Sequence, residues 1–226
     1  MTVQNIAILI PARGGSKGIP KKNLQTVGGI PLISRAVLAA QASAVSKDVY
    51  VTTDDPEIAS AAVSSGAKII TRPAELSTDE SSTEDAVLHF LQTMHITSGI
   101  VLFVQPTSPF VRGEDIRRLA ETCMNFDSCL TVTSSHGFLW KQEHDGTLSG
   151  VNHSSTARLR RQDLSESEFL ENGAAYGMRV EQFLQTRHRF FGRIGYVEMP
   201  RTRSIEIDGI EDLQLANCLS SLLDSK

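Results

Sequence analysis

Hydrophobic and polar positions alternate along the first half of the chain in blocks that predict strands and helices in turn. Short β-branched runs predict strands at 5–10, 48–53, 68–71 and 100–104, and amphipathic stretches predict helices at 31–44 and 56–65. Strands that alternate with helices are typical of βαβ units, which build a parallel sheet. The pattern therefore predicts an α/β fold with a mainly parallel central sheet flanked by helices.

Two helix starts carry capping signals. Asp55 precedes a proline at the first helical position, and Gly66 lies just past the end of that helix. A second helix is expected to begin near Ser81, because Ser81 and Glu84 have the spacing of a capping box. Asp54 and Asp55 form an acidic pair at a strand end, but the cap explains Asp55 better than metal binding does. We therefore leave both out of the candidate site.

The second half of the chain contains an irregular insertion. Residues 138–151 are typical of a hairpin that turns at Asp145-Gly146, and residues 152–171 are polar and rich in arginine and serine. Around this insertion the pattern predicts helices at 113–125 and 210–223 and strands at 129–133, 174–180, 194–199 and 205–207. We expect a single domain over 1–226, with an excursion at 138–171.

Composition narrows the class of protein. The chain has 226 residues, 40% of them hydrophobic, and 22 Lys+Arg against 26 Asp+Glu give a net charge of −4. This length and balance suit one globular domain and exclude disordered and fibrous classes. A mildly acidic chain is not expected to coat nucleic acid, so any phosphate site must be local.

The spacing of the cysteines and the length of the apolar runs indicate the cellular location of the protein. Cys123, Cys129 and Cys218 lack the spacing of a zinc site or a redox dithiol, which indicates reduced thiols in a cytoplasmic protein. The apolar runs have the length of strands rather than of membrane spans, so no membrane association is expected.

A glycine-rich, cationic loop follows the first predicted strand. Glycines let backbone N–H groups approach phosphate, and the nearby cations neutralise its charge. The spacing is neither that of a Walker loop nor that of the dinucleotide fingerprint. A solvated basic turn is the alternative, but four cations within ten residues favour phosphate binding. The residues expected to bind phosphate are Arg13, Gly14, Gly15, Ser16, Lys17 and Lys22.

Six segments resemble, in the same order, the motifs of one enzyme family. They are IPARGGSKGIP at 10–20, RPAEL at 72–76, QPTSPF at 105–110, RRQD at 160–163, ENGAAY at 171–176 and SIEID at 204–208. The family is that of the acylneuraminate cytidylyltransferases, also called CMP-sialic acid synthetases. The resemblance runs from residue 6 to about residue 215, which is nearly the whole chain.

The resemblance implies a Rossmann-like nucleotidyltransferase fold and transfer of CMP from CTP to N-acetylneuraminic acid, with release of pyrophosphate. It implies Mg²⁺ (or Mn²⁺) as cofactor, and Arg13, Lys22 and Asp208 as catalytic residues. Many bacterial members have Asp at the position of Glu206, so Asp208 is the safer metal ligand and Glu206 is expected to reach the ion directly or through water. No residue stands out as the general base.

By matched position, Asn23, Arg72 and Ser82 are expected to bind CTP together with the glycine-rich loop. Capping is the alternative role for the Ser82 region. The acceptor sugar is expected to contact Gln105, Arg160, Arg161, Asn172, Tyr176, Phe190 and Phe191. Arginines suit its carboxylate because a guanidinium binds carboxylates bidentately, whereas the alternatives are a solvated charge run for the arginines and ordinary core for the aromatic rings.

The family forms homodimers, so we expect residues 138–171 to reach a partner subunit and 158–161 to complete its site. Two other functions stay open. One is CMP transfer to a related nonulosonic acid such as legionaminic, pseudaminic or deaminated neuraminic acid, because Leu170 departs from many bacterial members and leaves the acyl group open. The other is a catalytically silent CTP-binding paralogue. Octulosonate enzymes rank last because their first loop differs.

Overall fold

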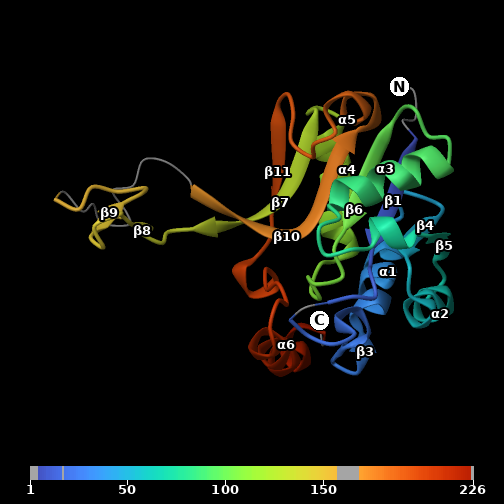
Figure 1. Cartoon of the computed structure of the whole chain (residues 1–226), viewed down its shortest axis with the longest axis horizontal. Coiled ribbons are helices and arrows are strands. Elements are labelled where there is room, and N and C mark those ends of the chain that lie inside the picture. The colour runs from blue at the N-terminus through green and yellow to red at the C-terminus, as the bar shows by residue number, and fades with distance from the viewer. Residues whose placement is uncertain (1–4, 17, 157–167, 225–226) are drawn as a thin grey trace.

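The computed structural model describes residues 5–16, 18–156 and 168–224, and a seven-stranded sheet forms its centre (Figure 1). The sheet contains β1 (Ile6–Pro11), β4 (Val49–Thr53), β5 (Lys68–Thr71), β6 (Ile100–Val104), β7 (Ser128–Ser135), β10 (Glu168–Arg179) and β11 (Ile194–Glu198). Their order is β11-β7-β10-β6-β1-β4-β5. All neighbours run parallel except β10, which is antiparallel to both β6 and β7. The predicted mainly parallel sheet is confirmed.

Helices cover both faces of this sheet. α1 (Leu32–Ala42), α2 (Pro56–Ser64) and α4 (Gly113–Cys123) pack on one face, and α3 (Thr83–Thr93) and α5 (Val180–Thr186) pack on the other. α6 (Ile210–Leu223) lies below the sheet in a separate cluster (Figure 1). Short 3-10 turns are η1 (Lys22–Leu24), η2 (Ala74–Leu76) and η4 (Arg201–Arg203). None of the helices in the described ranges is both long and apolar enough to span a membrane.

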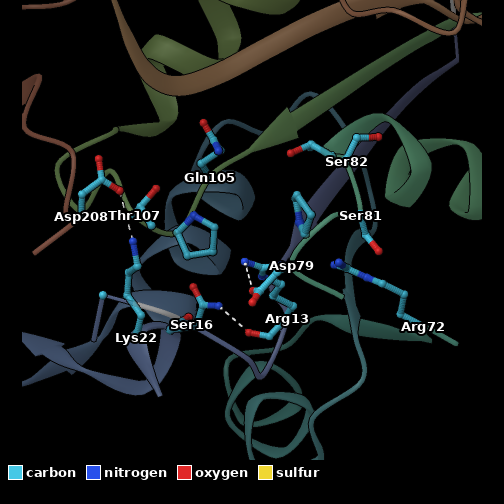
Figure 2. A pocket seen from close by; sticks show the side chains of 15 residues that line it. Arg13, Ser16, Lys22, Arg72, Asp79, Ser81, Ser82, Gln105, Thr107 and Asp208 are labelled. Carbon is cyan, nitrogen blue, oxygen red and sulfur yellow. Dashed lines mark hydrogen bonds and ion pairs between the residues drawn. The ribbon is translucent and has the colours of Figure 1, made fainter. Parts of the chain in front are cut away.

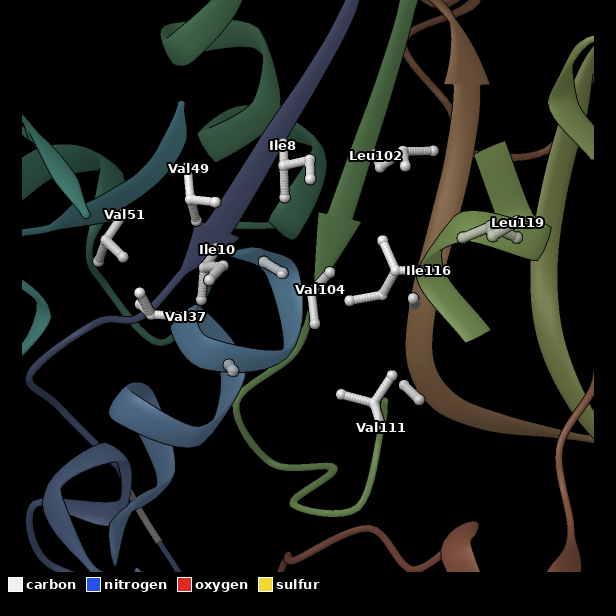
Figure 3. Packing of buried hydrophobic residues seen from close by; sticks show 14 of the residues in the cluster. Ile8, Ile10, Val37, Val49, Val51, Leu102, Val104, Val111, Ile116 and Leu119 are labelled. Carbon is white, nitrogen blue, oxygen red and sulfur yellow. The ribbon is translucent and has the colours of Figure 1, made fainter. Parts of the chain in front are cut away.

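The alternating side chains of β1 divide the core into two layers. Ile8 and Ile10 belong to the cluster that includes Val37 of α1 and Ile116 of α4 (Figure 3), whereas Leu9 belongs to the cluster on the α3 and α5 face. A strand buried on both faces is a continuous apolar run, as the sequence of β1 is. The first strand therefore lies deep in the molecule, and the loop after it begins at a rigid point.

A third cluster fixes the end of the chain beside that loop. The antiparallel pair β2 (Thr26–Val27) and β3 (Ile30–Pro31) follows η1, and Val27 packs with Leu213 and Ala216 of α6. Ile207, just before α6, is fully buried in the same cluster. Its backbone N–H donates to the carbonyl of Thr107 at 2.8 Å. This packing brings the 204–208 segment next to the loop after β6.

The predicted hairpin is confirmed, and it projects away from the sheet. β8 (Trp140–Gln142) and β9 (Leu148–Gly150) pair antiparallel, and Gly146 takes the positive φ of +84° that the turn requires. Figure 1 shows the hairpin at the end of the long extensions of β7 and β10, apart from the other elements.

Two predicted strands differ from the structure. β10 begins at Glu168, inside the segment predicted to be irregular up to 171, because it pairs there with the outer part of β7. Those residues pair with β7 alone, and their burial does not alternate along the strand, so no alternating pattern marks them. The strand predicted at 205–207 is absent, since that segment joins its neighbour through the single backbone bond of Ile207 rather than a ladder.

One helix cap is as predicted and the other shifts by one residue. The Asp55 side chain accepts from Glu57 N at 2.7 Å, which confirms the cap of α2. In α3 the capping box joins Ser82 and Asp85, with both reciprocal bonds present, so the predicted Ser81–Glu84 box is wrong. Ser81 instead accepts from Thr78 N.

Candidate functional site

A pocket of about 450 Å³ opens where β1 and β6 end, at the carboxyl edge of the parallel strands (Figure 2). Eight residues predicted from the sequence line it: Arg13, Ser16, Lys22, Asn23, Arg72, Ser82, Gln105 and Asp208. They come from the first loop, the end of β5, the start of α3, the end of β6 and the segment before α6. The fold thus brings together residues spread over almost the whole chain.

The glycine-rich loop is anchored from two sides. Gly14 N donates to Asp54 Oδ1 at 2.9 Å, and the Asn23 side chain donates to the carbonyl of Arg13 at 3.0 Å. A Cβ on Gly14 would lie 2.8 Å from Asp55 Oδ2, so the close approach requires glycine. Asp54, left out of the candidate site, therefore has a role in holding this loop.

Arg13 reaches across the pocket mouth to the segment before α3. Its Nη2 lies 3.0 Å from Asp79 Oδ1, and its Nη1 donates to the carbonyl of Thr78. Sequence reasoning did not select Asp79, because nothing in its local pattern distinguishes it from the neighbouring acidic residue Glu80. Lys17, also predicted in this loop, lies outside the described residues.

Lys22 and Asp208, both predicted to be catalytic, form the second ion pair. Lys22 Nζ lies 3.2 Å from Asp208 Oδ1 and donates to the carbonyl of Ile207 at 2.9 Å. The Lys22 side chain is only 16% exposed, whereas that of Asp208 is 78% exposed. An ammonium group held at this place can meet a ligand from inside the pocket wall.

Arg72 forms a buried cationic part of the wall. It is 6% exposed, and one of its N–H groups donates to the carbonyl of Thr52 at 2.7 Å. Burial lowers its pKa to about 10, a shift that Arg13 reinforces and Asp54 opposes. The guanidinium is still charged at neutral pH, so this side of the pocket attracts anions.

Glu206 lies near Asp208 but is partly buried, whereas the Asp208 side chain is mostly exposed. Burial raises the pKa of Glu206, and the nearby charge of Asp208 raises it further. A Cβ on Gly173 would lie 2.6 Å from a Glu206 carboxylate oxygen, so the glycine, at a φ of +68°, makes room for this side chain. The 204–208 segment thus carries two neighbouring carboxylates, of which Asp208 lines the pocket and Glu206 lies against Gly173 outside the lining.

These carboxylates suit a hard divalent cation. In the part of the chain that the structure describes, no group of three or more His, Cys, Asp and Glu side chains is arranged to hold a metal. Mg²⁺ is commonly held by one or two carboxylates, with substrate phosphates and water completing its octahedron. Asp208 and Glu206 have the chemistry for that kind of shared site.

Four residues predicted to contact the acceptor lie outside the pocket wall. Asn172 is buried, where its Oδ1 accepts from Thr131 Oγ1 at 2.7 Å. The Tyr176 ring stacks on Phe103 with centroids 4.6 Å apart, and its hydroxyl donates to Glu171. Phe190 and Phe191 pack partly buried against the α3 and α5 side of the core. The roles of these four residues in binding the acceptor stay predictions. The arginines predicted to bind the sugar carboxylate lie outside the described residues; they are Arg158, Arg160 and Arg161.

Arg189 connects this aromatic group to the start of α3. Its guanidinium lies 4.8 Å from the centroid of Tyr176, and its Nε donates to Glu84 Oε1 at 2.6 Å. Burial alone would raise the pKa of Glu84, but the bond and charge of Arg189 bring it below its ordinary value. Sequence reasoning missed this pair because its members belong to distant segments.

Comparison with known proteins gives consistent matches. The family described as Cytidylyltransferase matches residues 7–185. The chain is 37% identical over 210 residues to N-acylneuraminate cytidylyltransferase A of Danio rerio, covering 91% of this chain and 48% of the relative. It is 32% identical over 219 residues to N-acylneuraminate cytidylyltransferase of Escherichia coli, covering 93% and 51%. The chain thus spans about half the length of these relatives.

Solved structures share the fold. CMP:2-keto-3-deoxy-manno-octonic acid synthetase complexed with CTP superposes with a TM-score of 0.70 at 19% identity, covering 96% of this chain and 99% of the other. A 4-diphosphocytidyl-2C-methyl-D-erythritol synthase from Anaerococcus prevotii gives a TM-score of 0.67 at 14% identity, covering 97% of each chain. The predicted nucleotidyltransferase fold is confirmed.

Proposed function

This chain belongs to the cytidylyltransferase family, and we propose that it transfers CMP from CTP to N-acetylneuraminic acid and releases pyrophosphate. The observation that carries the proposal is the convergence of eight predicted residues on one pocket at the carboxyl edge of the sheet. The names of the relatives from Danio rerio and Escherichia coli support the sugar acceptor.

Reaction at the α-phosphate of CTP depends on cationic groups that the fold holds in position before the ligand binds. Attack on the α-phosphate of CTP develops charge on the phosphate oxygens, and preorganised cations stabilise that charge. Arg13 and Lys22 supply guanidinium and ammonium donors from the pocket wall. The backbone of residues 15 and 16 supplies N–H groups, because Asp54 already holds the N–H of Gly14. A Mg²⁺ or Mn²⁺ ion held by Asp208, with Glu206 directly or through water, would further neutralise the phosphates.

The remaining pocket residues divide between nucleoside and acceptor. Arg72 and Ser82 line the side formed by β5 and α3, where we place the cytidine portion of CTP. Gln105 follows β6, where its side-chain amide can hydrogen-bond hydroxyl or carboxylate oxygens of the sugar. Residues 158–161 of a partner subunit complete the acceptor site in this proposal, with the guanidinium groups binding the sugar carboxylate.

Pyrophosphate release tests the proposal. The whole chain is incubated with CTP, Mg²⁺ and a panel of nine-carbon keto acids, with UTP and ATP as nucleotide controls. Release with CTP and N-acetylneuraminate supports the proposal. Release only with another acid moves the activity to a sister cytidylyltransferase, and CTP binding without release under every condition identifies a silent binder.

A further inference from the structure

The ion pair between Arg13 and Asp79 has no part in the transfer chemistry proposed above. Arg13 Nη2 lies 3.0 Å from the Asp79 carboxylate, and Nη1 donates to the carbonyl of the preceding residue, Thr78. Asp79 belongs to the segment between η2 and α3, which faces the glycine-rich loop across the pocket (Figure 2). A guanidinium expected to bind phosphate is therefore already engaged by a carboxylate and a carbonyl.

The second pair in the pocket provides a comparison. Lys22 is likewise held by Asp208, but Asp208 gains another use when Lys22 turns to a ligand, because its carboxylate is then available to a cation. The transfer chemistry proposed above assigns no role to Asp79. Its position beside the phosphate-binding guanidinium therefore needs a separate explanation.

Competition between the Asp79 carboxylate and a phosphate for Arg13 explains this position. The charged residues among the described pocket lining are three cations and two carboxylates, namely Arg13, Lys22, Arg72, Asp79 and Asp208. A phosphate oxygen that approaches Arg13 competes with the Asp79 carboxylate for the same N–H groups and is repelled by its charge. The side chains of Arg13 and Asp79 are 29% and 45% exposed, so their pair is weak enough for a ligand to open.

We propose that Asp79 is a specificity-determining residue that acts as the displaceable counter-ion of Arg13 and lowers the affinity of the site for pyrophosphate. The inference rests on the proposed function. CTP brings contacts of its base and ribose that offset the opening of the pair. Pyrophosphate has only its phosphates, so closure of the Arg13–Asp79 pair favours its departure and weakens binding of other small polyphosphates.

Titration calorimetry with pyrophosphate and with CTP on the whole chain tests the inference. The variants are Asp79→Asn, which keeps the shape of the side chain, and Glu80→Gln, which removes the same charge from the adjacent exposed carboxylate outside the pocket lining. We expect Asp79→Asn to bind pyrophosphate about threefold tighter or more, with a steeper salt dependence, whereas Glu80→Gln changes affinity less than about 1.5-fold. In turnover assays, pyrophosphate should inhibit Asp79→Asn more strongly by the same factor.

Other outcomes overturn the inference in distinguishable ways. Weaker pyrophosphate binding by Asp79→Asn would show that Asp79 orients Arg13 instead of competing for it. Equal effects of Asp79→Asn and Glu80→Gln would show that pyrophosphate affinity depends on the net charge of the protein and not on the position of Asp79. Asp79→Glu, which retains the charge, should return the affinity toward that of the unsubstituted chain, and thermal unfolding checks that each variant is folded. If the unsubstituted chain binds neither CTP nor pyrophosphate, the proposed function itself fails.

Discussion

Two adjacent lysines show how position decides the role of a residue. Lys21 points away from the pocket to Glu57 and is 56% exposed, whereas Lys22 is 16% exposed and bonds to Ile207 and Asp208. Lys21 takes a left-handed conformation at a φ of +50°, which turns the chain so that its neighbour enters the pocket wall. Two identical side chains thus face different partners because the backbone turns between them.

Substitution of these two adjacent lysines gives a matched test of the proposed chemistry. Lys22→Gln removes a preorganised cation from the phosphates, so kcat/KM for CTP should fall by about a hundredfold or more. Lys21→Gln removes the same charge outside the pocket and should change kcat/KM less than about threefold. Steady-state kinetics measures both, and thermal unfolding should show only small changes. Equal losses in the two variants would contradict the assignment of Lys22.

Among the helices and strands, α3 begins at residues that both cap the helix and line the pocket. Ser82 caps the helix through Asp85 N at 3.1 Å, and Ser81, Ser82 and the first helical residue, Thr83, line the pocket. The cap fixes the direction in which the helix leaves the pocket wall. A shift of the cap by one residue would therefore move the hydroxyl groups that face the nucleotide side.

Cap substitutions distinguish the two serines. Ser82→Ala removes the acceptor for the Asp85 N–H and should lower the free energy of unfolding by about 1 kcal/mol. Ser81→Ala leaves that acceptor in place and should cost less than about 0.5 kcal/mol. Urea unfolding measures both values. A larger loss for Ser81→Ala would support the Ser81–Glu84 box instead.

The Glu84–Arg189 pair ties α3 to the segment after α5 and should make stability depend on pH. Both side chains are mostly buried, with exposures of 17% and 20%. The folded pKa of Glu84 lies below its ordinary value of 4.5, so the unfolded chain binds the proton more readily. The stabilisation is therefore complete above that ordinary value and is lost as the pH falls through the folded pKa.

Unfolding at several pH values measures this contribution. Glu84→Gln should lower the free energy of unfolding by about 1–3 kcal/mol at pH 7, because it weakens a charged, bidentate bond. The difference from the unsubstituted chain should shrink below pH 4.5. Glu181→Gln, also in the first turn of a helix but exposed, controls for the helix dipole. A loss that does not vary with pH would show that packing, not charge, is responsible.

At the scale of the whole molecule, the β8–β9 hairpin stands apart from the core and exposes large apolar side chains. Trp140 and Leu148 are 49% and 62% exposed. Among the described residues, Figure 1 shows no other helix or strand beside the hairpin. Exposed apolar groups gathered on a projecting hairpin are typical of a surface that another chain covers.

This arrangement supports the predicted homodimer and allows a test. We expect sedimentation velocity to show a dimer of the whole chain, and the double substitution Trp140→Ser and Leu148→Ser to shift it toward monomer with loss of activity. The control for lost apolar surface is Leu222→Ser, because Leu222 lies on α6 and is 66% exposed. A monomer that retains full activity would overturn the shared acceptor site.

Local pattern was enough to predict the alternation of strands and helices, the cap of α2, the hairpin turn and the position of the glycine-rich loop after the first strand. These features depend on periods of 2 and 3.6 residues and on neighbours within a turn, which a single segment carries. The motif resemblance extended this to residues of the pocket, because the motifs at 10–20, 72–76, 105–110 and 204–208 each contribute part of its wall.

Which side chains come into contact could be learned from the folded structure alone. The pairing of Arg13 with Asp79, the anchoring of Gly14 by Asp54 and the contact of Glu84 with Arg189 join segments far apart in the chain. The start of β10 also depended on a partner, since β7 supplies the hydrogen bonds that its polar residues need. No local pattern encodes such contacts, because their energy arises only when the folded sheet and helices bring the groups together.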